Sequence, residues 1–298
     1  MNIVEKRKIW FGLSGTIIVL GLIIGLFSGV NFGIDFTGGA LMEIEVHKEL
    51  PIAEIREIVD EFDPNASINL LGNERTTVQI RSTIDFNNKE RLEIFSRFQE
   101  KYDLDLQKDF LRTQQFGPSV GREIQSRALI SVLISAIGML VYITYRFELR
   151  FGLAAIAALI HDILVVLAVY SIVRIPVNSP FVAAILTILG YSINDTIVVF
   201  DRIRENLKFM KKNNYEQVAN DSIKQTITRS INTSVTTLIT IVTLYIFGVD
   251  QIREFALPLI AGIISGTYSS IFIASPVWVM LKEMQLRKTT YNPKPETK

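Results

Sequence analysis

Residues 189–206 read LGYSINDTIVVFDRIREN and decide how the whole chain has to be interpreted. The stretch begins inside an apolar run and ends in a dense run of charges, and Asp195 stands within its apolar part. A carboxylate at the centre of a membrane helix costs roughly 3 kcal/mol by insertion scales, and less near a helix end. An acid in that position is therefore a candidate functional residue.

The composition around this stretch is that of a membrane protein. Hydrophobic residues make up 49% of the 298 residues, and several apolar runs approach or exceed the roughly 18 residues that predict a membrane span. The predicted spans are residues 9–30, 128–145, 152–173, 181–200, 231–247 and 256–281. The net charge of +1 gives no sign of a nucleic-acid partner, and the absence of cysteine excludes disulfides and thiolate metal sites.

The first apolar run follows a basic start, Lys6, Arg7 and Lys8. A cleaved signal peptide is the alternative to a retained span, but the run is longer than the roughly 7–15 residues of a signal core and lacks a small-x-small exit. Basic residues also concentrate between the fourth and fifth spans. The bias of basic residues toward the cytoplasm therefore predicts a multi-pass membrane protein with both termini in the cytoplasm. The family resemblance described below implies that this membrane is the cytoplasmic membrane of a bacterium.

Between the first and second spans the chain changes character and alternates charged with apolar residues. The sequence therefore predicts a first transmembrane helix, an extracytoplasmic α+β domain, a five-helix transmembrane bundle and a cytoplasmic tail. Their predicted limits are residues 1–30, 31–125, 126–285 and 286–298.

The pattern inside the α+β domain predicts a small fold with its own core. Residue alternation predicts strands at 40–46, 67–71, 76–81 and 104–110, and helical periodicity predicts helices at 51–62 and 87–102. The order β-α-β-β-α-β is that of a ferredoxin-like unit. The expected fold class is thus a polytopic α-helical membrane protein with six transmembrane helices and an extracytoplasmic ferredoxin-like α+β domain.

The polar residues of the fourth and fifth spans form the main candidate site. Asn194 and Asp195 lie in the fourth span, and Tyr191 precedes them by one turn, where its hydroxyl could bond the carboxyl. Arg229 opens the fifth span, and Thr233 belongs to the hydroxyl-rich stretch that follows it. Because the two spans run antiparallel, Asp195 and Arg229 can reach similar depth. The pair is either a static buried ion pair or a site whose acid takes up and releases protons.

His161 and Asp162 are a second polar pair, in the third span. Adjacent helical residues point about 100° apart, so we expect that they do not both face one partner. They make either a polar contact between helices or a proton relay. A metal site is not expected, because the other histidine is His47 in the α+β domain. An intramembrane aspartyl protease would need Asp162 and Asp195 to share a proton, and neither lies in a glycine-bracketed motif.

Two glycine patterns complete the candidate residues. Asp35 opens the sequence DFTGG, whose Gly38 and Gly39 permit a tight turn into the first strand of the domain. Gly262 and Gly266 begin a row of small residues, four apart, along the last span. That row predicts a close helix-packing face, with a substrate groove as the alternative.

Four motifs taken together resemble the SecF family of the bacterial protein-export machinery. They are DFTGG after the first span, GYSINDTIVVFDRIREN across the fourth, RSINTSVTTL into the fifth and SGTYSSIFIASP in the sixth. The resemblance covers nearly the whole chain. SecF belongs to the resistance-nodulation-division superfamily of proton-driven membrane proteins.

The resemblance implies a function and a set of partners. It implies an accessory subunit that works with SecD beside the SecYEG channel and uses the proton gradient to promote export of unfolded preproteins that the SecA ATPase has pushed. Asp195 and Arg229 match the proton-path acid and arginine of the family. Membrane lipid is expected around the protein, and no cofactor or nucleic acid is expected. A lone acid does not distinguish protons from sodium ions.

Three other functions remain as alternatives. A small-molecule exporter subunit of the same superfamily would need a large porter domain, and a single domain of about 90 residues argues against it. A structural subunit that moves no protons would tolerate joint neutralisation of Asp195 and Arg229. An enzyme is not expected, because the sequence shows no nucleophile–base pair or phosphate loop.

The charged segment 201–228 is predicted to be an amphipathic helix along the membrane surface.

Overall fold

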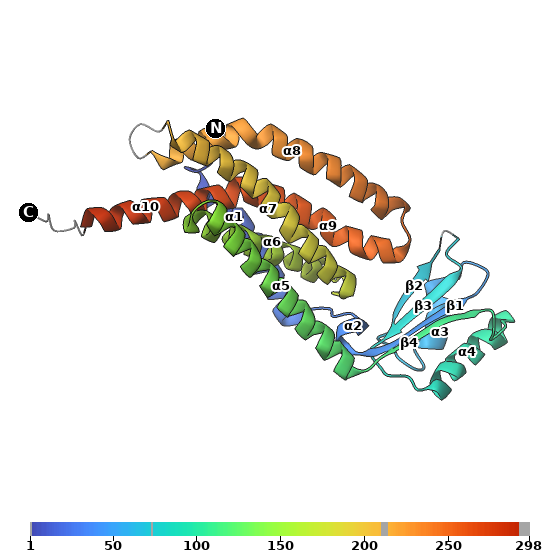
Figure 1. Cartoon of the computed structure of the whole chain (residues 1–298). Coiled ribbons are helices and arrows are strands. Elements are labelled where there is room, and N and C mark those ends of the chain that lie inside the picture. The colour runs from blue at the N-terminus through green and yellow to red at the C-terminus, as the bar shows by residue number, and fades with distance from the viewer. Residues whose placement is uncertain (1, 73, 210–213, 292–298) are drawn as a thin grey trace, which may run out of the picture.

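The computed structural model describes residues 2–72, 74–209 and 214–291, and within them a helical bundle and a small α+β domain lie at opposite ends of the molecule (Figure 1). Six helical segments of the described chain are long and apolar enough to cross a membrane. They are Arg7–Ser28, Ser119–Arg146, Leu149–Val173, Ser179–Leu207, Tyr215–Phe247 and Ile252–Leu286. Six membrane helices with an added α+β domain confirm the fold class expected from the sequence.

The α+β domain is an antiparallel sheet with two helices on one face. Its strands are β1 (Gly39–Glu45), β2 (Ser67–Leu71), β3 (Thr77–Ser82) and β4 (Phe110–Phe116), in the order β2-β3-β1-β4, and its helices are α3 (Ile52–Val59) and α4 (Asn88–Tyr102). Alternate residues of β1, Met42 and Ile44, are fully buried together with Ile55, Phe95 and Phe98 of the helices. The helices therefore cover one face of the sheet and leave the other face, which carries mostly polar residues, without a helix of the domain.

The last strand begins six residues later than the sequence predicted. Leu104 is buried, but its carbonyl accepts a hydrogen bond from Gln99 Nε2 at 2.8 Å, at the end of α4. The residues after it form a turn in which Asp109 accepts from the backbone N–H of Asp105 at 2.7 Å and contacts His47 Nε2 at 2.9 Å. These donors hold the pKa of Asp109 below its ordinary value, and the backbone N–H of Asp105 contributes the largest part of this effect. The prediction was wrong because β4 is a polar edge strand without the expected alternation.

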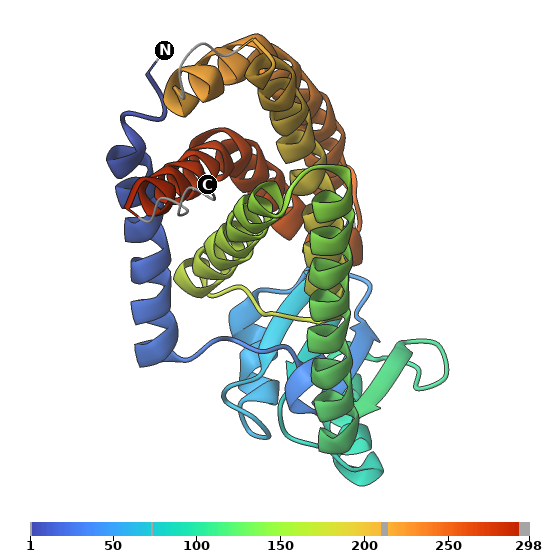
Figure 2. The same cartoon turned by 60° about the vertical axis from the view of Figure 1, so that its left-hand side comes forward.

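The bundle has a buried centre and an exposed periphery. In chain order its helices are α1 (Arg7–Ser28), α5 (Pro118–Arg146), α6 (Leu149–Val173), α7 (Ser179–Leu207), α8 (Tyr215–Phe247), α9 (Asp250–Ser269), a π-helical turn (Ser270–Ala274) and α10 (Ser275–Tyr291). In α6 and in α7, 50% of the residues in the most apolar stretch of the helix are buried inside the protein. In α1 and in α8, which lie at the outside of the bundle, the buried share is 11% (Figure 2). Polar residues of α6 and α7 are thereby shielded from lipid.

The charged segment 201–228 does not form a separate surface helix, contrary to the expectation. Its described parts extend α7 to Leu207 and start α8 at Tyr215, while residues 210–213 lie outside the described chain. Asn206 Nδ2 donates to Ser222 Oγ at 2.8 Å, and such contacts hold the two extensions together. The last helix also continues past the predicted end of its span, and residues 292–298 of the expected tail lie outside the described residues.

Candidate functional site

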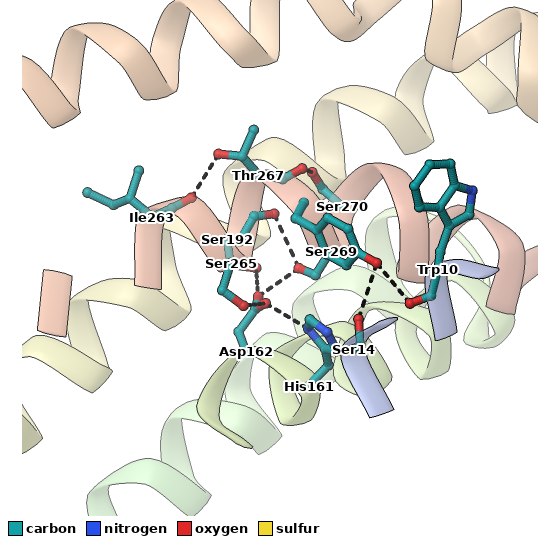
Figure 3. Close-up of polar contacts among 12 residues, drawn as sticks. Trp10, Ser14, His161, Asp162, Ser192, Ile263, Ser265, Thr267, Ser269 and Ser270 are labelled. Atoms are coloured by element: carbon teal, nitrogen blue, oxygen red, sulfur yellow. Dashed lines mark hydrogen bonds and ion pairs between the residues drawn. The ribbon is translucent and has the colours of Figure 1, made fainter. Parts of the chain in front are cut away.

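A buried carboxylate, Asp162 of α6, is the centre of a hydrogen-bond cluster that joins three helices (Figure 3). Its Oδ2 accepts from Ser192 Oγ of α7 at 2.6 Å and from Ser269 Oγ of α9 at 2.8 Å. Its Oδ1 accepts from Ser265 Oγ of α9 at 2.7 Å. Asp162 is 0% exposed, so every one of these bonds is made away from solvent. The cluster ties α6, α7 and α9 into one unit.

His161 joins the same cluster, although adjacent residues were expected to face different partners. Its Nδ1 lies 3.1 Å from Asp162 Oδ1, and its ring stacks on Tyr268 with the ring centroids 5.9 Å apart. The Tyr268 hydroxyl in turn donates to the carbonyl of Trp10 at 2.8 Å and accepts from Ser14 of α1 at 3.2 Å (Figure 3). The two adjacent residues therefore link the cluster to α1 as well.

Asp195 of α7 is also buried, at 3% exposure, but it has far fewer partners. Among the described residues, its carboxylate accepts one hydrogen bond, from Ser234 Oγ of α8, and that bond is long at 3.4 Å. Ser234 is itself engaged elsewhere, with Thr267 Oγ1 of α9 at 2.5 Å and the carbonyl of Ser230 at 2.9 Å. Asp195 thus lies where α7, α8 and α9 meet, without the dense donor set that surrounds Asp162.

Arg229 lies on the exposed side of α8, about one and a half turns before Ser234. Within the part of the chain that the structure describes, Arg229 and Asp195 form no ion pair. A static buried ion pair is therefore not what this structure contains. The carboxylate is inside the bundle, and the guanidinium is at its surface.

The remaining predicted neighbours of Asp195 have other contacts. The Tyr191 hydroxyl bonds Thr237 Oγ1 of α8 and the backbone carbonyl of Thr233, so it does not donate to the carboxylate as expected. Thr233 Oγ1 donates to the carbonyl of Arg229 at 2.9 Å, within its own helix. Asn194 is exposed on the outer side of α7. Tyr191 and Thr233 thus hold α7 against α8 one turn away from Asp195.

The glycines of α9 provide the close packing that brings these polar groups together. A Cβ at Gly262 would collide with the side chain of Ile188 of α7, and one at Gly266 would lie 3.1 Å from the Cβ of Ser192. Small residues at a helix interface let backbones approach closely. Because α9 lies so near α7, Ser265 and Ser269 reach the same carboxylate as Ser192.

The DFTGG motif connects the bundle to the α+β domain. Asp35 lies in the short helix α2 (Ile34–Thr37), and its Oδ2 accepts from the backbone N–H of Ser179, the first residue of α7, at 3.0 Å. Gly38 and Gly39 have positive φ angles of 82° and 140°, and a Cβ at Gly39 would meet a carbonyl of β3. The glycines thus permit the turn that leads from the bundle directly into β1.

An ion pair forms a second connection at the same place. Arg81 of β3 contacts Glu254 of α9 at 2.8 Å, with the two side chains 17% and 26% exposed. The other oxygen of Glu254 accepts from Asn178 Nδ2 at 2.8 Å, and Asn178 caps α7 by accepting from the N–H of Phe181. The α+β domain is therefore attached to α7 and α9, two of the helices that the Asp162 cluster joins.

The two buried acids differ in what protonation would change. A proton on Asp162 would disturb bonds to three hydroxyls on two other helices, and such charge-assisted bonds are strong. A proton on Asp195 would disturb one long bond to a hydroxyl that already has other partners. The two acids thus differ in their bonding: Asp162 joins three helices by short hydrogen bonds, and Asp195 has one long bond among the described residues.

Two family models match the chain. Residues 98–284 match the model described as protein export membrane protein SecD/SecF, C-terminal, and residues 23–49 match the SecD/SecF GG motif. The first region contains both buried acids, Asp162 and Asp195. The second contains Asp35 and the two glycines that follow it.

Individual proteins match over nearly the entire chain. The chain is 38% identical to protein translocase subunit SecF of Alicyclobacillus acidocaldarius, over 97% of this chain and 95% of that protein. It is 37% identical to protein translocase subunit SecDF of Bacillus subtilis, over 95% of this chain and 38% of that longer protein.

Solved structures show the same fold. The crystal structure of SecDF from Thermus thermophilus, a translocon-associated membrane protein, superposes with a TM-score of 0.82 and 32% identity, over 95% of this chain and 39% of that chain. SecDF in its Super-membrane-facing form gives a TM-score of 0.72 and 31% identity, over 98% and 40%. The chain thus spans about two fifths of the SecDF proteins that it matches and almost all of the SecF protein.

Proposed function

Because the chain belongs to the SecD/SecF family of protein-export membrane proteins, we propose that it acts as the SecF subunit of a bacterial protein translocase and that Asp195 couples it to the proton gradient. The observation that carries the proposal is the state of Asp195: buried among three helices, with one long hydrogen bond. A carboxylate in that setting can exchange a proton and thereby alter how α7 packs against α8.

The charge change at Asp195 has a defined mechanical consequence in this fold. The Asp162 cluster ties α7 to α6 and α9, so these three helices move together. The α+β domain is attached to the same unit through Glu254 and Asp35. Repacking at the contact between α7 and α8 therefore tilts the α+β domain together with this unit relative to α8, and the swing of the domain pulls on the emerging preprotein.

The energy available is sufficient for this motion. One proton that crosses a potential of about 100 mV releases roughly 2.3 kcal/mol. That free energy shifts a two-state equilibrium by well over tenfold. The site lies about 24 Å along α7 from Ser179, where the helix contacts the α+β domain, since sixteen residues separate the two positions. One helix therefore connects the proton site to the domain that does the work.

A second membrane protein completes the site in this proposal. Polar residues spaced three or four apart, Arg229, Asn232, Thr236 and Thr240, are exposed along α8. The Thr236 and Thr240 hydroxyls donate to carbonyls of α8 itself. Lipid does not satisfy Arg229 and Asn232, whereas a polar helix of another subunit does. SecD is the partner with the right properties, because the SecDF relatives are longer chains of which about two fifths match this one. Arg229 would then face water or SecD and attract the ionised form of Asp195.

The proposal also sets the orientation and the remaining partners. The α+β domain faces the outside of the cytoplasmic membrane and both termini face the cytoplasm, as the distribution of basic residues predicts. The subunit works beside the SecYEG channel on preproteins that SecA has begun to push. Membrane lipid surrounds α1, α5 and the free side of the bundle.

The test is export of a preprotein into inverted membrane vesicles that carry the chain together with SecD. We expect Asp195→Asn to abolish the stimulation by a proton gradient while ATP-driven export continues. Asp201→Asn is the matched control, because it makes the same change on the same helix at a half-exposed end, 3.7 Å from Arg146. Stimulation at the wild-type level in an Asp195→Asn vesicle with normal amounts of both subunits would refute the role. Replacing the proton gradient by a sodium gradient identifies the coupling ion.

A further inference from the structure

A cleft of about 340 Å³ separates the α+β domain from the end of the bundle. Its size falls within the roughly 300–1,000 Å³ of ligand sites. One wall is the uncovered face of the sheet, where Asn65, Ser67 and Asn69 follow one another along one side of the chain. The opposite wall contains Arg174 and Asn178, from the loop before α7. We call this space the interdomain cleft.

The sheet wall of the interdomain cleft has unused hydrogen-bonding capacity. The side chains of Asn65, Ser67 and Asn69 are exposed, and none of them bonds another residue that the structure describes. Asparagine amides both donate and accept, as a peptide backbone does. The wall is therefore complementary to a ligand rich in amide groups.

The charges that line the cleft are already neutralised or bonded. Arg81 pairs with Glu254, and Glu254 also accepts from Asn178. The Arg174 guanidinium donates to the carbonyls of Ser28 at 2.8 Å and Gly29 at 2.6 Å. A phosphate or another anion would therefore meet no unengaged guanidinium on the described walls. The lining also contains apolar residues, among them Phe32, Ile175 and Pro176, so a neutral ligand with both polar and apolar groups fits it better than an anion.

The neighbouring strand favours an extended ligand. β2 is an edge strand of the sheet, and Ser67 and Asn69 belong to it. Edge strands present unpaired backbone groups, and extended peptides bind to them without sequence preference. A peptide that lies along β2 would have its backbone paired by the strand, and its side chains on the cleft face would lie beside the asparagine side chains.

From these observations we infer that the interdomain cleft is a binding site for an extended segment of the exported polypeptide. The inference rests on the proposed function, which supplies unfolded polypeptide as the ligand class. A segment in the cleft touches β2 on one side and the start of α7 on the other. Its grip is therefore sensitive to the tilt of the α+β domain that protonation of Asp195 sets.

The first test is site-specific photocrosslinking with the full chain and SecD in lipid nanodiscs. A photoreactive benzoylphenylalanine replaces Asn69 in the cleft or, as the control, Arg97 on the exposed side of α4. The probe is a fluorescein-labelled, uncharged segment of an unfolded preprotein. We expect crosslinking from position 69 well above that from position 97. Equal crosslinking from both positions, or none from position 69, overturns the inference.

The second test is the affinity for the same peptide by fluorescence anisotropy. The double variant Asn65→Ala with Asn69→Ala loses about two hydrogen bonds, so we expect Kd to rise roughly tenfold, while Arg97→Ala leaves it unchanged. Because the contacts are neutral, Kd should also be almost independent of salt. An unchanged Kd in the double variant, or a steep salt dependence, contradicts the site.

The two proposals fail separately. If Asp195→Asn abolishes gradient-driven export and position 69 captures no peptide, the interdomain cleft is wrong and the proton site stands. If position 69 captures peptide and Asp195→Asn exports normally, the cleft stands and the proton site is wrong.

Discussion

The two buried acids of the bundle provide a direct test of the difference between a structural and a titrating carboxylate. Asp162→Ala and Asp195→Ala make the same chemical change at positions that are 0% and 3% exposed. The loss of side-chain volume and of a buried polar group is therefore nearly the same in both variants. What differs is the set of hydrogen bonds that each variant loses.

The expected magnitude follows from those bonds. Asp162→Ala removes three bonds from serine hydroxyls at 2.6, 2.7 and 2.8 Å. Hydrogen bonds between membrane helices contribute about 0.6 kcal/mol on average and up to about 1.7 kcal/mol, so the loss is roughly 2–5 kcal/mol. Asp195→Ala removes one bond of 3.4 Å, which is weak by its length, so its loss should stay below about 0.6 kcal/mol.

Tryptophan fluorescence provides the assay without any added label. The chain has two tryptophans, and both lie in the bundle: Trp278 stacks on Phe151 at 5.0 Å, and Trp10 lies 4.4 Å from Phe272, measured between ring centroids. Unfolding in mixed detergent micelles with rising SDS therefore reports on the bundle rather than on the α+β domain. Equal losses in the two variants, or a larger loss in Asp195→Ala, would refute the assignment of a structural role to one acid and a titrating role to the other.

Three further predictions concern the junction, the helix packing and the α+β domain. Arg81→Glu and Glu254→Arg should each destabilise the junction, and the double variant should lose about 1 kcal/mol less stability than the sum of the two single losses. Hydrogen exchange of β3 in the wild type and the three variants measures this double-mutant cycle. Gly262→Val should push α9 away from α7 and cost roughly 1–3 kcal/mol in the SDS titration, whereas Gly138→Val, where a Cβ meets nothing within 4 Å, should cost much less. The pKa of Asp109 is lowered mainly by the backbone N–H that it accepts, so its contribution to stability is complete above the ordinary value of 3.8 and is lost as the pH falls below it. Hydrogen exchange of β1 in the full chain should show this loss, and Asp109→Asn should reduce the pH dependence but leave the part due to Glu45, whose pKa is also lowered.

The fold was largely predictable because its signals are local. Long apolar runs predicted the six spans, and residue alternation predicted β1, β2 and β3 within one or two residues. β4 was misplaced because one side of an edge strand lacks a partner strand, and the sequence FLRTQQF carries no alternating pattern. The charged segment between α7 and α8 was misread because contacts between its two halves, such as Asn206 with Ser222, determine its course.

The site was only half predictable for the same reason. An acid inside an apolar run is a local signal, and it identified both Asp195 and Asp162. Ser192, Ser265 and Ser269 were missed, because serines are common in membrane helices and their partner is set by how α7 and α9 approach each other. Two clues were present: the four-residue spacing of the α9 serines, and their place beside the glycine row.

The unequal bonding of the two acids determines which parts of the molecule can move. Asp162 fastens α6, α7 and α9 by short bonds, and Glu254 and Asp35 fasten the α+β domain to α9 and α7. α8 has no such bond to Asp162, and its contact with Asp195 is a single long one. In the proposed mechanism a change of charge at Asp195 acts on this long contact, while the Tyr191–Thr237 and Ser234–Thr267 bonds keep α8 against α7 and α9. In that mechanism the α+β domain, which is bonded to α7 and α9, follows the three-helix unit when α7 repacks against α8.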